Sequence, residues 1–368
     1  MAKRLSAYKG CLLGLAVGDA MGRPVNQWTL EEIRAGYGPE GLRGFDCLNG
    51  YATVTAHTQL AAYAVNGLLL GLTRGQLKGE MAPYVRYICV AETEWARQQS
   101  YTRFQKPFFC WVGDDEVIRA RRTRDNLLVD TLLQNRVGTM EEPRNKRDGA
   151  STLPAAAAVG MFYEPGRISR AELRRLGAET VALTHGTPAA FLAGAALAHL
   201  LSRTLYDGEK DLKALIAETA EAMQQQFGRD YTQGCGIVCG ALRAVVALAE
   251  SGEVSEAEAM EQMNCDDAAR VLAGALYACL MHPDDIEAAL ITAVNHSGKS
   301  SAVAAIAGAI LGSMLGDRSL REFFLPDLEP IRCLEPLAAD LSQGCPMVRG
   351  SAMFDFSWDE KYVTYRRG

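Results

Sequence analysis

The sequence lacks a strong excess of charge of either sign. Over 368 residues, 38 Lys and Arg residues stand against 44 Asp and Glu residues, a formal net charge of −6. Such a chain has no general attraction for a phosphate backbone or an anionic lipid surface. We therefore expect neither nucleic acid nor a membrane as a partner. The densest basic run, at Arg119, Arg121, Arg122 and Arg124, is flanked by acidic residues and is expected to form a solvated helix face.

Long apolar runs are also missing. The N-terminal stretch that follows Lys3 and Arg4 is interrupted by Gly10, Gly14 and Asp19, and no cleavage pattern of a signal peptide follows it. No apolar run reaches the ~18–20 residues of a membrane span without a polar interruption. These absences favour a soluble, cytoplasmic protein.

Paired cysteines are absent too. The ten cysteines include no Cys-x-x-Cys pair, which disfavours a zinc site or a disulfide framework. Most of them lie in apolar helical patterns, so we expect reduced and buried thiols, as is usual in a cytosolic protein.

What the sequence does contain is a long series of helical patterns. Alternating strand patterns are almost absent, and no flexible linker or 20–50-residue repeat divides the chain, so we expect one compact, all-α, multi-helix domain over residues 1–368. Residues 136–154 break the helical pattern and are expected to form a long loop. The expected helices lie at 6–20, 29–35, 57–72, 80–97, 115–134, 170–182, 188–203, 210–226, 236–250, 256–263, 266–279, 284–295, 301–315 and 330–342. Asp284 and Asp285 favour the start of one helix, and Asp114, Asp115 and Glu116 that of another.

The 35 glycines are not scattered at random. Two sets are spaced by four residues, so that each set lies along one face of a helix: Gly10, Gly14, Gly18 and Gly22, and then Gly308, Gly312 and Gly316. A glycine inside a helix costs about 1 kcal/mol relative to alanine. Two explanations remain open from the sequence: close approach of another helix backbone, or a face turned toward a ligand.

Four segments, in order along the chain, resemble the ADP-ribosylglycohydrolase family, which includes the dinitrogenase-reductase-activating glycohydrolases. The first runs from Gly10 to Pro24 (GCLLGLAVGDAMGRP) and the second from Thr58 to Leu68 (TQLAAYAVNGL). The third is Leu183–Ala190 (LTHGTPAA), and the fourth is Ala293–Gly298 (AVNHSG), which an Ala/Gly-rich helix follows. The resemblance implies an all-helical ADP-ribosylglycohydrolase-like domain. In that family two Mg²⁺ ions in a cleft assist removal of ADP-ribose from a modified side chain or a related acceptor.

The carboxylates that would hold those ions are missing here. The family's Thr-Asp-Asp-Thr motif falls on Thr55, Ala56, His57 and Thr58. Its Asp-x-Asp-Ser/Thr motif, which follows His296, Ser297 and Gly298, falls on Lys299, Ser300, Ser301 and Ala302. The acidic residue that usually follows the first helix is replaced by Asn26. Mg²⁺ prefers carboxylate oxygens and dehydrates reluctantly, so we expect no metal cofactor.

The other substrate-binding segments depart from the family pattern as well. The family's glycine-rich substrate loop would fall on the segment from Gly149 through Ser151 to Ala155, without its Met and Arg, and Ile237 and Gly240 stand where relatives carry Trp and Glu. The ligand-binding cleft that the resemblance implies comprises Asn26, Thr55, Ala56, His57, Thr58, Gly149, Ser151, His296, Ser297, Gly298, Lys299, Ser300 and Ser301.

His57 and Lys299 allow chemistry of their own. An imidazole near neutrality can act as a base or bind a soft metal, but for His57 we favour an ordinary polar residue at a helix start. An ammonium group beside His57 and the hydroxyl groups of Ser297, Ser300 and Ser301 can hold a phosphate or a carboxylate. That anion pocket requires the Lys299 ammonium group to face Thr55, His57 and Ser301; otherwise Lys299 extends into solvent. His185 and His199 are expected to be structural.

Three functions stay open at this level. The chain is a catalytically silent family member that binds an ADP-ribose-like or other anionic small molecule, or a protein partner. Alternatively, it hydrolyses a glycosidic bond without metal, with His57 as the base and Asp19 or a serine assisting. Lastly, it is a scaffold or regulatory partner of an active relative.

Overall fold

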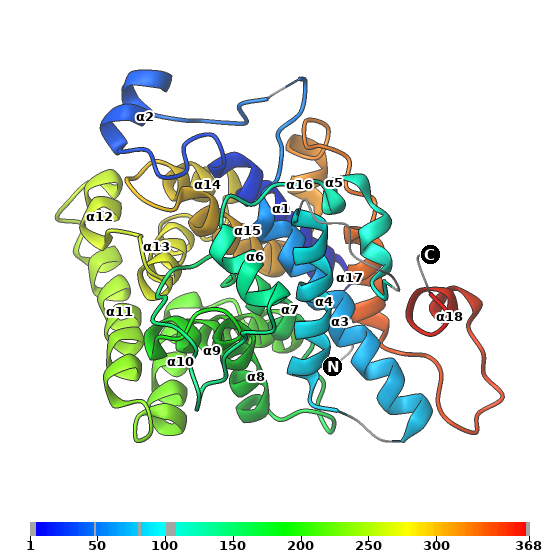
Figure 1. Cartoon of the computed structure of the whole chain (residues 1–368). Helices are drawn as coiled ribbons and strands as arrows, with labels where there is room; N and C mark the ends of the chain where they lie inside the picture. The colour runs from blue at the N-terminus through cyan, green and yellow to red at the C-terminus, as the bar shows by residue number, and fades with distance from the viewer. Residues whose placement is uncertain (1–4, 48, 80–81, 101–107, 366–368) are drawn as a thin grey trace.

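Helices provide nearly all the regular structure of the residues that the computed structural model describes, namely 5–47, 49–79, 82–100 and 108–365 (Figure 1). Within these ranges there is no strand, only isolated β-bridges between Ala52 and Leu328 and between Cys265 and Gly298. The elements are α1 (Leu5–Gly22), α2 (Leu30–Tyr37), α3 (Ala56–Lys78), α4 (Tyr84–Gln99), the 3-10 turn η1 (Trp111–Asp114), α5 (Glu116–Arg119), α6 (Asn126–Leu133), α7 (Ala155–Met161), α8 (Arg170–Ala182), α9 (Pro188–Ser202), the π-helical turn η2 (Arg203–Asp207), α10 (Leu212–Phe227), α11 (Thr232–Ser251), α12 (Glu256–Met263), α13 (Ala268–Met281), α14 (Ile286–Val294), α15 (Ser300–Leu315), α16 (Arg318–Phe323), α17 (Leu334–Gln343) and α18 (Phe356–Tyr362). The all-α fold class is confirmed.

The pair α1 and α15 forms the centre of the fold, and glycine is what allows it. A Cβ atom added to Gly14 would overlap the carbonyl group of Gly308, and one added to Gly10 would overlap that of Gly312. Buried residues make up 15 of the 18 in α1 and 15 of the 16 in α15. The two glycine sets therefore serve direct contact between helix backbones, which decides between the two explanations left open by their spacing.

Two stretches are long and apolar enough, by length and composition alone, to span a membrane. The first is α9 with η2, Pro188–Asp207, and 83% of its apolar window is buried inside the protein. The second is α11, at one edge of the molecule, and only 33% of its window is buried (Figure 1). For α9 the hydrophobic character is accounted for by its place in the core.

The expected helix at 115–134 is wrong as a single element. Asp115 caps α5 by accepting hydrogen bonds from the N–H groups of Val117 and Ile118, and the chain leaves helical geometry at Ala120. A second cap, Asp125, starts α6. Arg119 is the exposed last residue of α5, whereas Arg121, Arg122 and Arg124 lie in the connection, so the basic run does not form one helix face.

Two arginines of the basic run, Arg121 and Arg122, bind the connection between α5 and α6 to other parts of the fold. Arg121 donates to the carbonyl groups of Gln98 and Ser100, and Arg122 pairs with Glu329.

Three short helices, α7, α16 and α18, have no counterpart among the expected elements, while the long loop over 136–154 is irregular as expected. The cap of α14 by Asp285, which accepts from Ala288 N–H, also matches the expectation. The ten cysteines are free thiols, and most are buried.

The glycine contact generates a stability prediction. Replacing Gly14 with alanine forces the α1 and α15 backbones apart, and we expect it to lower the free energy of unfolding by about 2 kcal/mol or more. Gly240 of α11 is the matched control, because a Cβ atom there would meet nothing within 4 Å. Gly240→Ala should raise stability by up to ~1 kcal/mol through helix propensity. Urea unfolding of both variants checks this, and shifts of the same sign would contradict it.

Candidate functional site

The centre of the candidate site is the buried carboxylate of Asp19, near the end of α1. It accepts hydrogen bonds from three residues at the starts of two other helices. Thr55 donates through its N–H group at 2.8 Å and its hydroxyl group at 2.7 Å. Thr58 does the same at 3.1 and 2.7 Å, and the hydroxyl group of Ser301 donates at 2.6 Å. Both carboxylate oxygens are therefore occupied by protein donors.

Local structure explains why these donors meet. Thr55 is the N-cap of α3, so the first N–H groups of that helix have no partner inside it and are free to bind an anion. Gly22 lies against the backbone of Ser300 and Ser301, which brings the start of α15 beside Asp19. One carboxylate thus joins the end of α1 to the beginnings of α3 and α15.

These bonds decide the charge of Asp19. Burial alone would raise the pKa of the carboxyl group, but the hydrogen bond and charge of His57, together with the hydroxyl groups of Ser301 and Thr58, outweigh burial and lower the pKa to about 2. Asp19 is therefore ionised at neutral pH and acts as an anion that several donors share.

His57 lies at the edge of the same cluster, with 15% of its side chain exposed. Its Nδ1 atom is 3.2 Å from the Thr55 hydroxyl oxygen and 3.4 Å from both Ser301 Oγ and Asp19 Oδ1. The imidazole is therefore oriented by a carboxylate and two hydroxyl groups, as a polar residue at a helix start or a positioned base would be.

The residues at the family's metal positions do not fit Mg²⁺. Ala56 and Ala302 offer no side-chain ligand atom, and Asn26 uses its side-chain oxygen to accept from the N–H group of Ser301 at 3.2 Å. The carboxylate of Asp19 is saturated by the donors named above. Among the described residues, no group of three or more His, Cys, Asp or Glu side chains is placed to hold a metal ion.

Lys299 does not lie where the expected anion pocket needs it. Its ammonium group donates to the backbone carbonyl of Asp266 rather than to the hydroxyl groups around Asp19. The nitrogen is 3.3 Å from the point where a Cβ atom on Gly149 would stand. The expected grouping of Lys299 with Thr55, His57 and Ser301 is therefore wrong, because a carbonyl group from the segment before α13 draws the ammonium group to the other side.

His185 lies beside Lys299 and Gly149. Its Nε2 atom is 3.7 Å from the same point at Gly149, is buried and has no hydrogen-bond partner among the described residues. Burial, followed by the charge of Arg147, lowers the pKa of His185 to about 3, so the ring is neutral. Nδ1 lies 2.9 Å from the hydroxyl oxygen of Thr184 and 3.2 Å from that of Thr152. In the tautomer in which one of these hydroxyl groups donates to Nδ1, the proton is on Nε2, and Nε2 can donate to a ligand.

Ser151 belongs to a third arrangement. Its hydroxyl group donates at 3.0 Å to Asp125, which also pairs with Arg147. Burial opposes ionisation of Asp125, but the N–H group of Leu128 and the guanidinium group of Arg147 together lower the pKa of the carboxyl group. The Nη1 atom of Arg147 is buried and, within the described ranges, without a hydrogen-bond partner.

The remaining cleft residues turn toward other parts of the fold. Ser297 donates to Glu261 through its N–H and hydroxyl groups at 2.5 and 2.9 Å. His296 is buried beside the carbonyl group of Ser297, and burial lowers its pKa. Gly298 has φ +134° and forms the bridge to Cys265, while Ser300 contacts the carbonyl group of His296 at 3.4 Å.

The expected cleft is thus divided. Thr55, His57, Thr58, Ser301 and Asn26 gather at Asp19, whereas Lys299 and Gly149 gather at His185. The sequence expectation treated His185 as structural, and it did not include Arg147 or Asp125. The Thr-His-Gly segment was the available signal for His185, but only the fold shows that Nε2 faces Gly149.

Comparison with known proteins agrees with this geometry. The family model described as ADP-ribosylglycohydrolase matches residues 1–350. The chain belongs to the ADP-ribosylglycohydrolase family.

One solved structure, titled "ADP-ribosylglycohydrolase-related protein complex", shares the fold with a TM-score of 0.62 at 24% sequence identity, covering 93% of this chain and 98% of that one. No curated protein matches the sequence.

The Asp19 cluster gives a pH prediction. An Asp19→Asn variant should be less stable at pH 7, because the amide opposes its donors. The folded-state pKa lies below the ordinary value of 3.8, so the carboxylate stabilises the fold above pH 4 and loses this effect as the pH falls toward 2.

The stability gap between wild type and Asp19→Asn should therefore narrow by about 1 kcal/mol between pH 5 and pH 3 in urea unfolding. The exposed Asp284→Asn is the control, with little effect at either pH. If the difference in free energy of unfolding between wild type and Asp19→Asn were the same at both pH values, the lowered pKa of Asp19 would be contradicted.

Proposed function

We propose that this family member does not carry out metal-dependent hydrolysis and instead binds an anionic ligand of the ADP-ribose kind, as a ligand-binding or regulatory protein. The observation that carries the proposal is the saturation of Asp19: the carboxylate nearest the family's metal positions already accepts five protein hydrogen bonds. A divalent cation there would have to displace these donors and would find no second carboxylate. The ten free thiols suit a reducing compartment, which supports a cytoplasmic location.

The surroundings of Gly149 favour binding of an anion. Around Gly149 lie the ammonium group of Lys299 and the unpartnered Nε2 of His185, and Arg147 acts on His185 as a further positive charge. A phosphate or carboxylate would supply the acceptor that His185 lacks and would neutralise a cationic group. Gly149 leaves room for that oxygen, because a side chain there would fill the space.

Thermal shift and calorimetric titration test the proposal. ADP-ribose and ADP should raise the melting temperature according to their concentration relative to Kd, whereas Mg²⁺ and Mn²⁺ alone should not. Lys299→Met should weaken ADP-ribose binding by about tenfold, and Lys210→Met, which alters an exposed residue outside both clusters, should leave it unchanged.

A chain carrying Ala56→Asp, His57→Asp, Lys299→Asp, Ser301→Asp and Ala302→Thr is the positive control for metal binding. Micromolar Mg²⁺ affinity of the natural chain, with turnover of ADP-ribosylarginine or O-acetyl-ADP-ribose, would refute the proposal. A chain that acts only as a scaffold would show no stabilisation by any of these ligands.

The contact between His57 and Asp19 favours one second candidate, a metal-free hydrolase. Nδ1 of His57 lies 3.4 Å from Asp19 Oδ1, which leaves Nε2 to take a proton from a water molecule that attacks the sugar carbon. The glycosidic bond to the acceptor breaks in the same step, and the proton on Nε2 then passes to the leaving group. The carboxylate here orients the base rather than acting as a nucleophile, because its oxygens are occupied.

An assay with the chelator EDTA distinguishes the metal-free hydrolase from the ligand-binding protein. The metal-free route predicts turnover of ADP-ribosyl substrates in EDTA that rises with a single pKa and falls by at least ~100-fold in His57→Gln. The ligand-binding proposal predicts no turnover in EDTA and ADP-ribose affinity within about twofold of wild type in His57→Gln, since His57 lies in the other cluster.

A further inference from the structure

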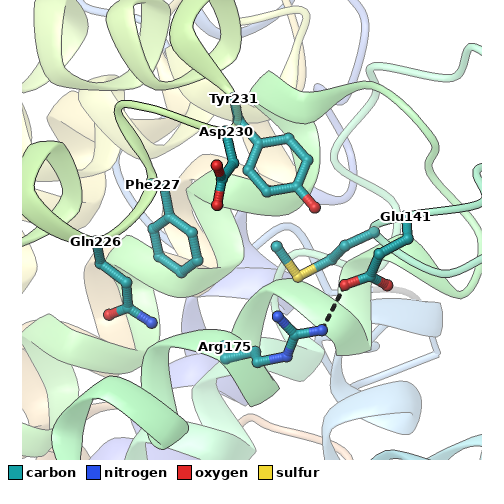
Figure 2. Close-up of a pocket in the computed structure, with 7 residues that line it drawn as sticks. Glu141, Arg175, Gln226, Phe227, Asp230 and Tyr231 are labelled. Atoms are coloured by element: carbon teal, nitrogen blue, oxygen red, sulfur yellow. Dashed lines mark hydrogen bonds and ion pairs between the residues drawn. The ribbon is translucent and has the colours of Figure 1, made fainter.

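A cavity of about 390 Å³ lies apart from both clusters, between the loop that precedes α7, helix α8 and the turn from α10 to α11 (Figure 2). Met140 and Glu141 come from the loop and Arg175 from α8. Gln226, Phe227, Asp230 and Tyr231 complete the lining. None of these residues takes part in the proposed function.

Polar groups provide more of the cavity's surface than apolar groups do, and Tyr231, Phe227 and Met140 provide its aromatic and apolar part. Met140 and Phe227 are buried, with 3% and 4% of their surface exposed. The ring of Tyr231 lies edge-on to the ring of Phe191, with 5.3 Å between the ring centroids, and tilted to the ring of Phe227, with 6.5 Å between the centroids. Two neighbouring rings therefore hold it in position. A thioether and aromatic faces suit an alkyl chain and the cation that it carries.

The charge at the rim is negative. The single guanidinium group of the lining, that of Arg175, is bound by two carboxylates, Glu141 at 2.5 Å and Glu179 at 2.8 Å. Asp230 has no hydrogen-bond or ion-pair partner in the described part of the chain, and Figure 2 shows it beside Tyr231, across the cavity from Arg175. The pKa of the Tyr231 hydroxyl group is raised, first by burial and then by the negative charge of Glu141. Asp230 and Glu179 also raise this pKa, and Arg175 lowers it.

We propose that this cavity is a binding site for a small organic cation of the alkylammonium class, whose charge lies against Asp230 and whose alkyl part lies on Tyr231, Phe227 and Met140. The internal pair of Arg175 with Glu141 occupies one side, and the unpartnered carboxylate of Asp230 lies on the other. The cavity of about 390 Å³ is larger than such a cation, so the site admits it without movement of the backbone.

Saturation-transfer NMR titrations at pH 7 and low salt test this site, with butylammonium as the probe and 1-butanol as its uncharged counterpart. Butylammonium should bind saturably and 1-butanol should not, and added NaCl should weaken the binding. Asp230→Asn should weaken it by about three- to tenfold, while the exposed Asp284→Asn should leave it unchanged. Equal binding of the two probes, or full binding to Asp230→Asn, would overturn the proposal.

A second variant should change the affinity for butylammonium in the opposite direction. Arg175→Gln removes the internal cation and leaves Glu141 and Glu179 free, so butylammonium should bind several-fold more tightly. Weaker binding in this variant would contradict the charge argument. Comparing butylammonium with Nα-acetyl-lysine amide then shows whether a free amine or a lysine side chain is the better source of the cation.

Discussion

Direct contact between the backbones of α1 and α15 holds the centre of the molecule together. Two glycine sets, with a four-residue period in each, remove the side chains that would keep the helices apart, and both helices are buried almost all round. The residues around Asp19 take their places from this contact, since Ser301 reaches the carboxylate only because Gly18 and Gly22 allow the start of α15 to come close.

Within that frame, a single anion joins three helices. Asp19 accepts the unpaired N–H groups at the beginning of α3 and the hydroxyl groups of Thr55, Thr58 and Ser301. At the positions where the family resemblance implies paired metal ions, the present chain has hydroxyl groups and one buried negative charge. Its positive charges, on Lys299 and Arg147, lie on the side of His185. The cleft is thereby divided into a closed structural half and a half with donors still unused.

Sequence reasoning succeeded where the information is local. Glycines four residues apart must share a helix face, and the contact between α1 and α15 uses both sets. It failed where a contact joins distant segments. The direction of the Lys299 side chain depends on a carbonyl group at Asp266, and the unused Nε2 of His185 depends on the path of the loop at Gly149. The expected helix at 115–134 failed for a different reason, since Asp115 and Asp125 are two caps and each begins a helix of its own.

The central pair also has a consequence for synthesis of the protein. Helix α1 is made before α15, but the backbone that covers it belongs to residues 300–315, and the bond between Asp19 and Ser301 spans 282 positions. During translation this apolar helix remains without its partner until most of the chain has left the ribosome. Contacts of such long range form slowly and leave hydrophobic surface open in the meantime. A chain that ends before α15 lacks the backbone against which α1 packs and cannot complete its core.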